Sequence, residues 1–282
     1  MDTTGIEQPI GALHADTASL ADAAALAGGD HVALIADGSV DEWHRAVHAA
    51  GAGAPSTSYL VSVDDTVRGG AASATPGGRR IDGGVVLATT EAPVADPIEY
   101  LRAVLSEAVD GPTGSVVVDD LGALLPADAD PMATVDDLVD LAAEFGVEFH
   151  ARATGEGDVL SALARRLPGA DDDADRAIAA HLVSHLREAD PTNFGYLRRH
   201  WRDARRGLAA VDMTYPQSKQ VHASLSDTET SPRTLGAALQ ALVKLGALGV
   251  WGDTVAANRY DLTGYDPARI DAVGAILTDL DD

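Results

Sequence analysis

The chain has 282 residues, enough for two ordinary domains, and 46% of them are apolar but only 4% aromatic, so its cores must consist mainly of Ala, Val and Leu. The chain has no cysteine, which excludes disulfides and thiolate metal sites. It also has no apolar run of membrane-spanning length and no signal-peptide pattern at residues 1–16. We therefore expect a cytoplasmic protein with no membrane contact. A net charge of −24 argues against a nucleic-acid partner unless the charge is unevenly distributed.

Residues 1–170 alternate between helix-like and strand-like segments. Helices are expected at 11–27, 41–51, 95–109, 134–145 and 156–167, and apolar strand-like runs at 31–37, 56–63, 85–90, 115–125 and 147–154. Near-continuous apolar strands separated by amphipathic helices indicate an α/β domain, with a mostly parallel sheet and helices on both faces. The Gly-rich stretch 69–84 predicts a loop, and the Pro, Gly and Asp residues of 168–175 mark the junction to a second domain, 171–282.

The second domain is predicted to be mostly helical. Two helices, at 175–189 and 191–211, precede a short third one that starts near residue 216. The polar turn SDTET leads to a fourth helix within SPRTLGAALQALVKLGAL, and two short strands, ALGVW and NRYDL, follow around GDTVAA. Helix, turn, helix and then a hairpin is the order of a winged helix-turn-helix.

The charge is indeed uneven along the chain. Residues 192–260 hold 9 basic and 5 acidic side chains, whereas residues 1–191 hold 10 basic and 33 acidic ones. A positive island in an acidic chain is typical of a nucleic-acid-binding domain, although an Arg-rich helix that pairs with the protein's own carboxylates would give the same count. The chain has 18 Arg but only 2 Lys, and much Asp, a composition that resembles proteins of halophilic archaea.

The fourth helix carries the candidate DNA-reading residues. Ser231 is a good N-cap, Pro232 fits the first helical position and Gly246 suits the stop. One side of the helix is apolar, and the other side brings together Arg233, Ala237, Gln240 and Lys244, with Thr234 at the border. Arg can bond to guanine, Gln to adenine, and an Ala methyl can lie against thymine. The same pattern also fits an ordinary polar helix face or a dimer contact.

Further DNA contacts are expected around this helix. Gln217, Ser218 and Lys219 open the third helix, whose first amides can bind phosphate. Asn258 and Arg259 lie at the base of the predicted wing, where they either contact DNA or only form the hairpin. The Arg-rich helix 194–211 either contacts the DNA backbone or lines a dimer interface.

Residues 176–265, above all SDTETSPRTLGAALQALVKLGAL and NRYDLTGYDP, resemble the winged-helix region of a family of haloarchaeal transcription regulators, the TrmB-suppressor (TbsP-like) family, and the whole chain is similar in outline. The resemblance implies a sequence-specific regulator of genes of central sugar metabolism. It also implies a homodimer bound to double-stranded DNA.

The first domain shows no catalytic apparatus. SVVVDD, which ends at Asp119 and Asp120, resembles the Walker B strand of RecA-like ATPases, but no GK[ST] loop follows the first strand and no Lys precedes residue 219. We therefore predict a degenerate RecA-like domain without ATP hydrolysis, enzymatic activity or cofactor. The pairs His44/His48 and His181/His185 have metal spacing, but each lacks a third ligand, so we predict solvated helix surface and no metal.

Three alternatives remain open for the chain as a whole. The leading one is a DNA-binding regulator whose first domain holds a dimer together or senses a small-molecule effector, at the strand ends near Asp37, Asp64 and Asp119. The second is a non-catalytic module that docks a protein partner through its winged helix. The third, a diverged nucleotide-dependent enzyme, is weakened by the missing phosphate loop.

Overall fold

The computed structural model of the chain describes residues 11–27, 30–49, 57–64, 79–81, 85–108, 114–154, 157–251, 258–263 and 265–280. The chain divides into two compact units, Met1–Val159 and Leu160–Asp282. The division lies within helix α6 (Gly157–Arg166), before the junction at residue 170 that the sequence suggests. Most of α6 belongs to the second unit because it is bonded there: the Ser161 hydroxyl donates to the Lys244 carbonyl at 2.6 Å.

The first unit is an α/β fold around one twisted sheet, as predicted. Five strands run parallel in the order β4 (Val85–Glu91), β2 (Ser58–Asp64), β1 (Asp30–Ile35), β5 (Gly114–Val118) and β6 (Glu148–Ala151). A short antiparallel strand, β3 (Arg79–Ile81), extends the β4 edge inside the stretch expected to be a loop. The rest of that stretch, 69–78 and 82–84, lies outside the described residues.

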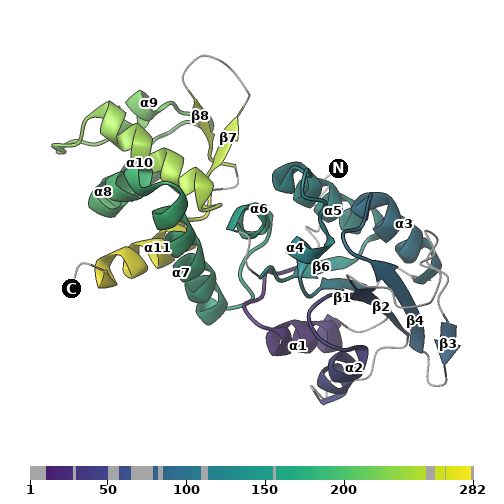
Figure 1. Cartoon of the computed structure of the whole chain (residues 1–282). Coiled ribbons are helices and arrows are strands. Elements are labelled where there is room, and N and C mark those ends of the chain that lie inside the picture. Colours follow the sequence, from purple (N-terminus) through teal and green to yellow (C-terminus); the bar gives the residue numbers. More distant parts are fainter. Residues whose placement is uncertain are drawn as a thin grey trace, which may run out of the picture. The chain divides into compact units, whose positions relative to one another are not determined.

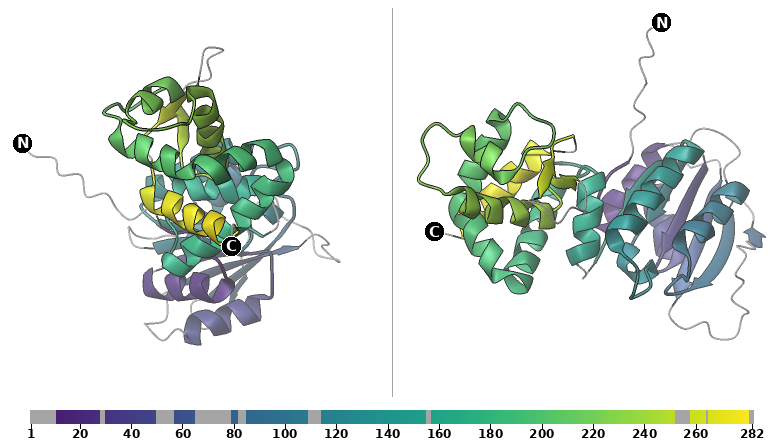
Figure 2. Two further views of the ribbon diagram at one scale, coloured as in Figure 1. Left: turned by 90° about the vertical axis from the view of Figure 1, so that its left-hand side faces the viewer. Right: turned by 90° about the horizontal axis from the view of Figure 1, so that it is seen from above.

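Helices cover both faces of this sheet (Figures 1 and 2). On one face lie α1 (Thr17–Ala27) and α2 (Val40–Ala49), and on the other lie α3 (Pro97–Ala108) and α5 (Pro131–Phe145). Helix α1 begins later than residue 11, because the Asp16 carboxylate accepts the Ser19 N–H at 2.8 Å, as an N-cap does. Before it, residues 11–14 are not helical, and Leu13 forms a parallel bridge with Ala151.

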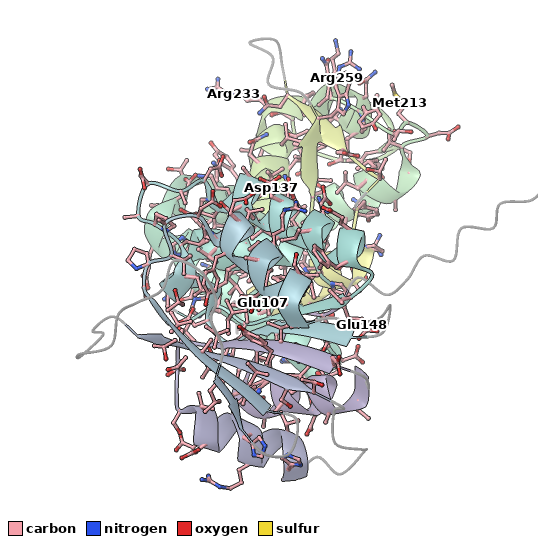
Figure 3. All side chains as sticks on the ribbon, turned by 90° about the vertical axis from the view of Figure 1, so that its right-hand side faces the viewer. Glu107, Asp137, Glu148, Met213, Arg233 and Arg259 are labelled. Atoms are coloured by element: carbon pink, nitrogen blue, oxygen red, sulfur yellow. The ribbon has the colours of Figure 1, made fainter. Side chains whose placement is uncertain are left out.

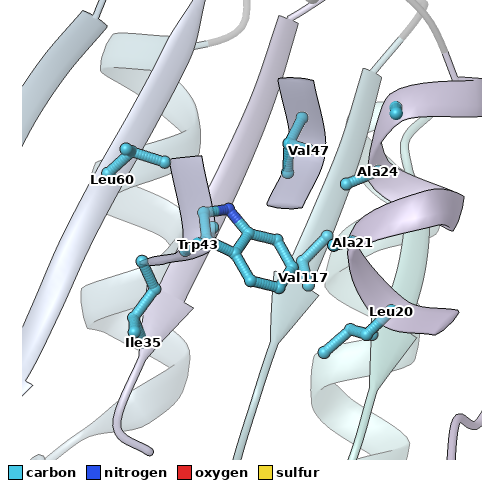
Figure 4. Close-up of a cluster of buried hydrophobic side chains, with 10 residues drawn as sticks. Leu20, Ala21, Ala24, Ile35, Trp43, Val47, Leu60 and Val117 are labelled. Atoms are coloured by element: carbon cyan, nitrogen blue, oxygen red, sulfur yellow. The ribbon is translucent and has the colours of Figure 1, made fainter. Parts of the chain in front are cut away.

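The core on the α1/α2 face consists mainly of small and branched aliphatic side chains around one tryptophan (Figure 4). Trp43 of α2 is 2% exposed and packs with Ile35, Leu60 and Val117 of the sheet. Ala21 and Ala24 present only methyl groups, so α1 can lie close to the strands. An apolar run on both faces of each strand is what a parallel sheet covered by helices requires.

The second unit is helical with one hairpin. Its elements are α6, α7 (Asp172–Ala189), α8 (Pro191–Ala210), α9 (Ser218–Ala223), α10 (Pro232–Lys244), β7 (Gly249–Trp251), β8 (Arg259–Asp261) and α11 (Pro267–Asp279). Helix α11, which the sequence reading did not include, lies along α7 and α8 (Figure 1). None of the helices in the described parts of the chain is both long and apolar enough to cross a membrane.

A buried arginine links the last helix of this unit, α11, to its first two helices, α6 and α7. Arg269 of α11 is 1% exposed, and its guanidinium donates to the carbonyl oxygens of Ala164, at 2.5 Å, and Leu167, at 3.2 Å. It also pairs with Asp175 of α7 at 3.2 Å. One side chain thus satisfies carbonyls at the end of α6, which have no partner inside the helix.

Candidate nucleic-acid interface

Helix α10 begins with the cap that the sequence predicts. The Ser231 hydroxyl accepts the Thr234 N–H at 3.1 Å and lies 2.8 Å from the Thr234 hydroxyl, and Pro232 occupies the first turn. The apolar side of the helix is buried through Leu235, Ala238, Leu239, Ala241 and Leu242. Packing on this side therefore fixes which residues of α10 face away from the core.

The turn between α9 and α10 is bonded to α8. The Asp203 carboxylate of α8 accepts hydrogen bonds from the hydroxyls of Thr228, at 2.9 Å, and Thr230. The Thr230 carbonyl in turn lies 2.6 Å from Nε2 of His222 on α9. Burial raises the pKa of Asp203, but the hydrogen bonds from Thr230, Arg206 and Thr228 outweigh it and lower the pKa below its ordinary value. The anionic carboxylate thus holds the turn, and with it the start of α10.

Helix α9 lies close to α10 and α8 because glycines face it. A Cβ on Gly236 of α10 would be 3.3 Å from the Cβ and the hydroxyl of Ser218, and one on Gly207 of α8 would be 2.8 Å from a methyl of Val221. The Gln217 N–H donates to the Gln220 side chain at 2.7 Å and so closes the first turn of α9. These contacts pack α9 against both α8 and α10.

The hairpin is attached to the helices through the segment between α8 and α9. The Tyr260 N–H donates to the Pro216 carbonyl at 2.9 Å, the Leu262 N–H to the Thr214 carbonyl at 3.0 Å, and Gln217 forms an antiparallel bridge with Arg259. Residues 214–217 therefore pair with β8 on the side opposite β7. The buried Tyr260 hydroxyl donates to the Gly236 carbonyl at 3.2 Å, which joins the hairpin to α10.

The predicted reading face of α10 is divided by these contacts. Arg233, at its N-terminal end, is exposed, and Ala237 is half-buried. Gln240 donates from Nε2 to the Tyr260 hydroxyl at 3.3 Å, and the Lys244 ammonium pairs with Asp190 at 2.7 Å. The hydrogen bond from Lys244 lowers the pKa of Asp190. The C-terminal half of the face is thus bonded within the unit, and the N-terminal half is open.

The other predicted contact residues fall into two groups. Lys219, Ser231, Asn258 and Arg259 are exposed, whereas Gln217, Ser218 and Thr234 are half-buried. Arg233 and Arg259 point outward at one end of the second unit (Figure 3). Within the described residues no ion pair engages Lys219, Arg233 or Arg259.

Several arginines of the Arg-rich helix α8 have partners within the second unit. Arg205 pairs with Asp271 at 2.9 Å and donates to the Tyr265 hydroxyl at 3.0 Å, and Arg206 pairs with Asp203. Arg202 lies over the Trp201 ring, 4.7 Å from its centroid. Self-pairing therefore accounts for part of the positive island.

The sequence reading missed residues on both sides of α10. The hydroxyls of Thr228 and Thr230 were read only as a polar turn, although their spacing before Ser231 allows them to bond a neighbouring helix. Tyr215 and Trp251 were not singled out either; their ring centroids lie 5.1 Å apart, and Trp251 is 49% exposed. The scarcity of aromatic residues in this chain was the available signal.

In the first unit, at the carboxyl ends of the strands, the Asp119 carboxylate is hydrogen-bonded to the loop after β1. Asp119, which follows β5, is buried and accepts the N–H groups of Ala36, at 2.6 Å, and Asp37, at 3.1 Å. Burial raises its pKa from 3.8 to about 6. Arg152 pairs with Asp37 at 2.8 Å. The Ala36 and Asp37 amides of the loop after β1 are thus bonded to the chain's own carboxylate.

Asp120 caps a short helix instead of continuing the strand. It accepts the Gly122 N–H of α4 (Leu121–Leu124) at 3.1 Å and the Thr154 N–H at 3.2 Å. The run 115–125 is therefore a strand followed by a helical turn. Asp64 ends β2.

The histidines predicted to be helix surface form one close pair. Nε2 of His44 lies 3.0 Å from Nε2 of His48 on α2, and both side chains are accessible to solvent, while His181 is exposed on α7. In the parts of the chain that the structure describes, no three His, Cys, Asp or Glu side chains are placed to share a metal ion.

The fold and the site define a protein of two units: an α/β unit with a parallel sheet, and a helical unit that presents one open, cationic helix end beside a hairpin. No known protein family, curated protein or solved structure matches the chain.

Proposed function

We propose that the protein is a transcription regulator that binds double-stranded DNA through a winged helix-turn-helix in its second unit. The observation that carries this proposal is the pairing of residues 214–217 with β8, beside a short helix, a fixed turn and a capped helix. Helix α8, this strand segment, α9, α10 and the hairpin β7–β8 follow one another in the order of a winged helix. In such a domain α10 is the helix that enters the major groove.

The distribution of charge supports DNA as the partner. Arg233 lies in the first turn of α10, where recognition helices contact base edges, and an Arg bonded to guanine contributes about 1–3 kcal/mol of discrimination. Lys219 and Arg259 are exposed on α9 and β8 and are suited to phosphate contacts. Gln240 and Lys244 have partners inside the unit, so we assign the base contact to the N-terminal half of α10, from Arg233 to Ala237.

The first unit is proposed to have a regulatory role. Asp119 bonds the amides after β1, which supports a degenerate RecA-like domain that lacks the phosphate loop and hydrolyses no ATP. We propose that this unit holds a homodimer together or responds to a small-molecule effector. Regulation of central sugar metabolism genes in a halophilic archaeon, and a cytoplasmic location, rest on the resemblance and the composition alone.

The test is genome-wide mapping of occupied DNA after crosslinking in the native cells. Two variants that each remove one cation from α10, Arg233→Ala and Lys244→Ala, are compared with the unchanged protein. We expect discrete promoter peaks that disappear with Arg233→Ala and remain with Lys244→Ala, because Lys244 is paired with Asp190, whereas exposed Arg233 has no ion pair among the residues that the structure describes.

The opposite results are equally informative. Promoter peaks that remain with Arg233→Ala would show that Arg233 does not make the sequence-specific contact. An absence of enrichment for the unchanged protein, at equal expression and under every growth condition tried, would favour the alternative module that docks a protein partner.

A further inference from the structure

Two histidines of α2, His44 and His48, lie side by side where solvent reaches the helix, and are here called the α2 histidine pair. Trp43 and Val47 point from α2 into the core and are 2% and 4% exposed, so packing fixes the rotation of the helix (Figure 4). The residue after each of them is therefore held at the same edge of α2, one turn apart. Nε2 of His44 lies 3.0 Å from Nε2 of His48, and the ring centroids are 4.2 Å apart.

The distance between the two Nε2 atoms suits two ligands of one metal ion. With metal–nitrogen bonds of about 2.05 Å, nitrogens 3.0 Å apart subtend an angle of about 95° at the metal. That angle fits the tetragonal geometry of Cu²⁺ or Ni²⁺, whereas tetrahedral Zn²⁺ would require about 3.3 Å. A tetragonal ion can complete its coordination with oxygen from water, so it does not need the third protein ligand whose absence argues against zinc.

The charge of the pair and of its surroundings favours a cation. Burial and the neighbouring His48 lower the pKa of His44, so its ring is neutral at pH 7. Two Nε2 atoms this close must be one donor and one acceptor, since two protonated nitrogens would repel each other. A metal ion can bind both when the donor ring changes to its other neutral tautomer. The first unit, with 27 acidic and 6 basic side chains, attracts cations in general.

A third imidazole near the pair has an unused nitrogen. His31 of β1 is 2% exposed, its Nδ1 lies 3.4 Å from the Ser58 hydroxyl, and its Nε2 has no hydrogen-bond partner among the described residues. Like Ile35, it faces the side of the sheet that α2 covers, because alternate residues of a strand share a face. Burial and the charges of His44 and His48 lower its pKa to about 4, so this ring adds no positive charge. A buried nitrogen without a partner is uncommon and indicates a polar ligand nearby.

We propose that the α2 histidine pair chelates one divalent transition-metal ion per chain, through Nε2 of His44 and Nε2 of His48, with water in the remaining positions. Imidazole nitrogen suits Cu²⁺, Ni²⁺ and Zn²⁺, and the affinity of such sites is highest for Cu²⁺. Cu²⁺ is therefore the ion that this site prefers. Both ligands belong to the first unit, so the site does not depend on the DNA contact proposed for the second unit.

The experiment is a calorimetric titration of the untagged, full-length protein with CuCl₂, and electron paramagnetic resonance of the bound Cu²⁺ counts its nitrogen ligands. His44→Gln and His48→Gln each leave one ligand and are expected to weaken binding at least about a hundredfold, because the advantage of two linked ligands is lost. The unchanged protein should show two nitrogen ligands and each variant one. His181→Gln, from the pair of the same spacing on α7, is the matched control and should leave the affinity unchanged.

Melting temperatures without metal confirm that the glutamine variants are folded before their affinities are compared. Unchanged affinity in the double variant His44→Gln/His48→Gln, or an equal loss with His181→Gln, would overturn the site. One ion per two chains, with dimers in sedimentation only when Cu²⁺ is present, would overturn the water-completed chelate and show that a second copy supplies the other ligands. Each of these results leaves the proposed function standing, since that function is tested by DNA occupancy and by variants of α10.

Discussion

At the scale of single residues, the fold strongly shifts the ionisation of Asp119. It is buried after β5, and although it accepts two backbone N–H groups, the loss of solvation outweighs them and raises its pKa to about 6. In the unfolded chain the same carboxyl titrates near its ordinary value of 3.8. The native state therefore binds the proton more tightly, and the stabilisation is present below pH 3.8 and lost as the pH rises through about 6.

Asp119→Asn should remove this dependence on pH. Because the amide stays neutral, the free energy of unfolding of the variant, minus that of the unchanged protein, is expected to rise by at most about 3 kcal/mol between pH 4 and pH 7. Urea unfolding followed by Trp43 fluorescence, in a background with Trp201→Phe and Trp251→Phe, reports the first unit alone. A difference that stays constant across this range would contradict the raised pKa.

The candidate site shows how far residue patterns reach. The helical periodicity and the cap at Ser231 correctly predicted which side of α10 is buried. Periodicity could not show that Gln240 and Lys244 have internal partners, because Tyr260 and Asp190 lie 20 and 54 residues away in the sequence. Such long-range partners leave no local signal.

At the scale of the elements, glycines determine how closely helices pack in the second unit. A Cβ on Gly274 of α11 would lie 2.3 Å from the Trp201 ring of α8, so α11 can rest against this ring only through a residue without a side chain. Gly195, also helical, has nothing within 4 Å of its Cβ position. Substitutions at these two positions therefore separate the effect of a glycine's close packing from the effect of its low helix propensity.

Gly274→Ala is expected to destabilise the second unit by about 1–3 kcal/mol, because the ring or the helix must shift. Gly195→Ala should stabilise it by up to about 1 kcal/mol, because alanine favours the helix and meets no clash. Urea unfolding followed by Trp201 fluorescence, with Trp43 and Trp251 replaced by Phe, measures both. Equal effects of the same sign would show that Trp201 does not pack on Gly274.

Sequence patterns predicted most elements but not all their ends. Helix α11 is not among the elements predicted from the sequence, although Asp266 and Pro267 provide a cap and Ile270, Val273 and Leu277 are suitably spaced. Strand β3 was read as loop since three residues are too few for a periodic pattern. Helix α6 was assigned to the first domain, because a sequence cannot show that Arg269 bonds its last carbonyls.

At the scale of the whole molecule, the two units differ sharply in charge. Residues 1–159 carry 6 basic and 27 acidic side chains, whereas residues 160–282 carry 14 basic and 17 acidic ones. The α/β class of the first unit follows from apolar strands alternating with helices, since burial on both faces leaves a strong signal. The net charge of the whole chain conceals this difference, which the sequence shows only when it is divided at the unit boundary.

This difference predicts that the two units respond unequally to salt. Repulsion within the acidic first unit is screened as the Debye length falls from about 30 Å at 0.01 M salt to about 8 Å at 0.15 M. We expect the unfolding temperature of the first unit to rise by several degrees over this range, as for a gain of about 1 kcal/mol. The nearly balanced second unit should change much less.

Each unit can be followed in the intact chain by its own tryptophans, Trp43 in the first and Trp201 in the second, with the other tryptophans replaced by Phe. Thermal melts in NaCl should then separate as the salt concentration is lowered, with the first unit unfolding earlier. Because both units share one solution, an effect of NaCl on water or on apolar burial in general would raise both transitions together. Parallel shifts would therefore contradict an electrostatic origin, and a rise confined to the first unit would show that its excess of carboxylates limits its stability.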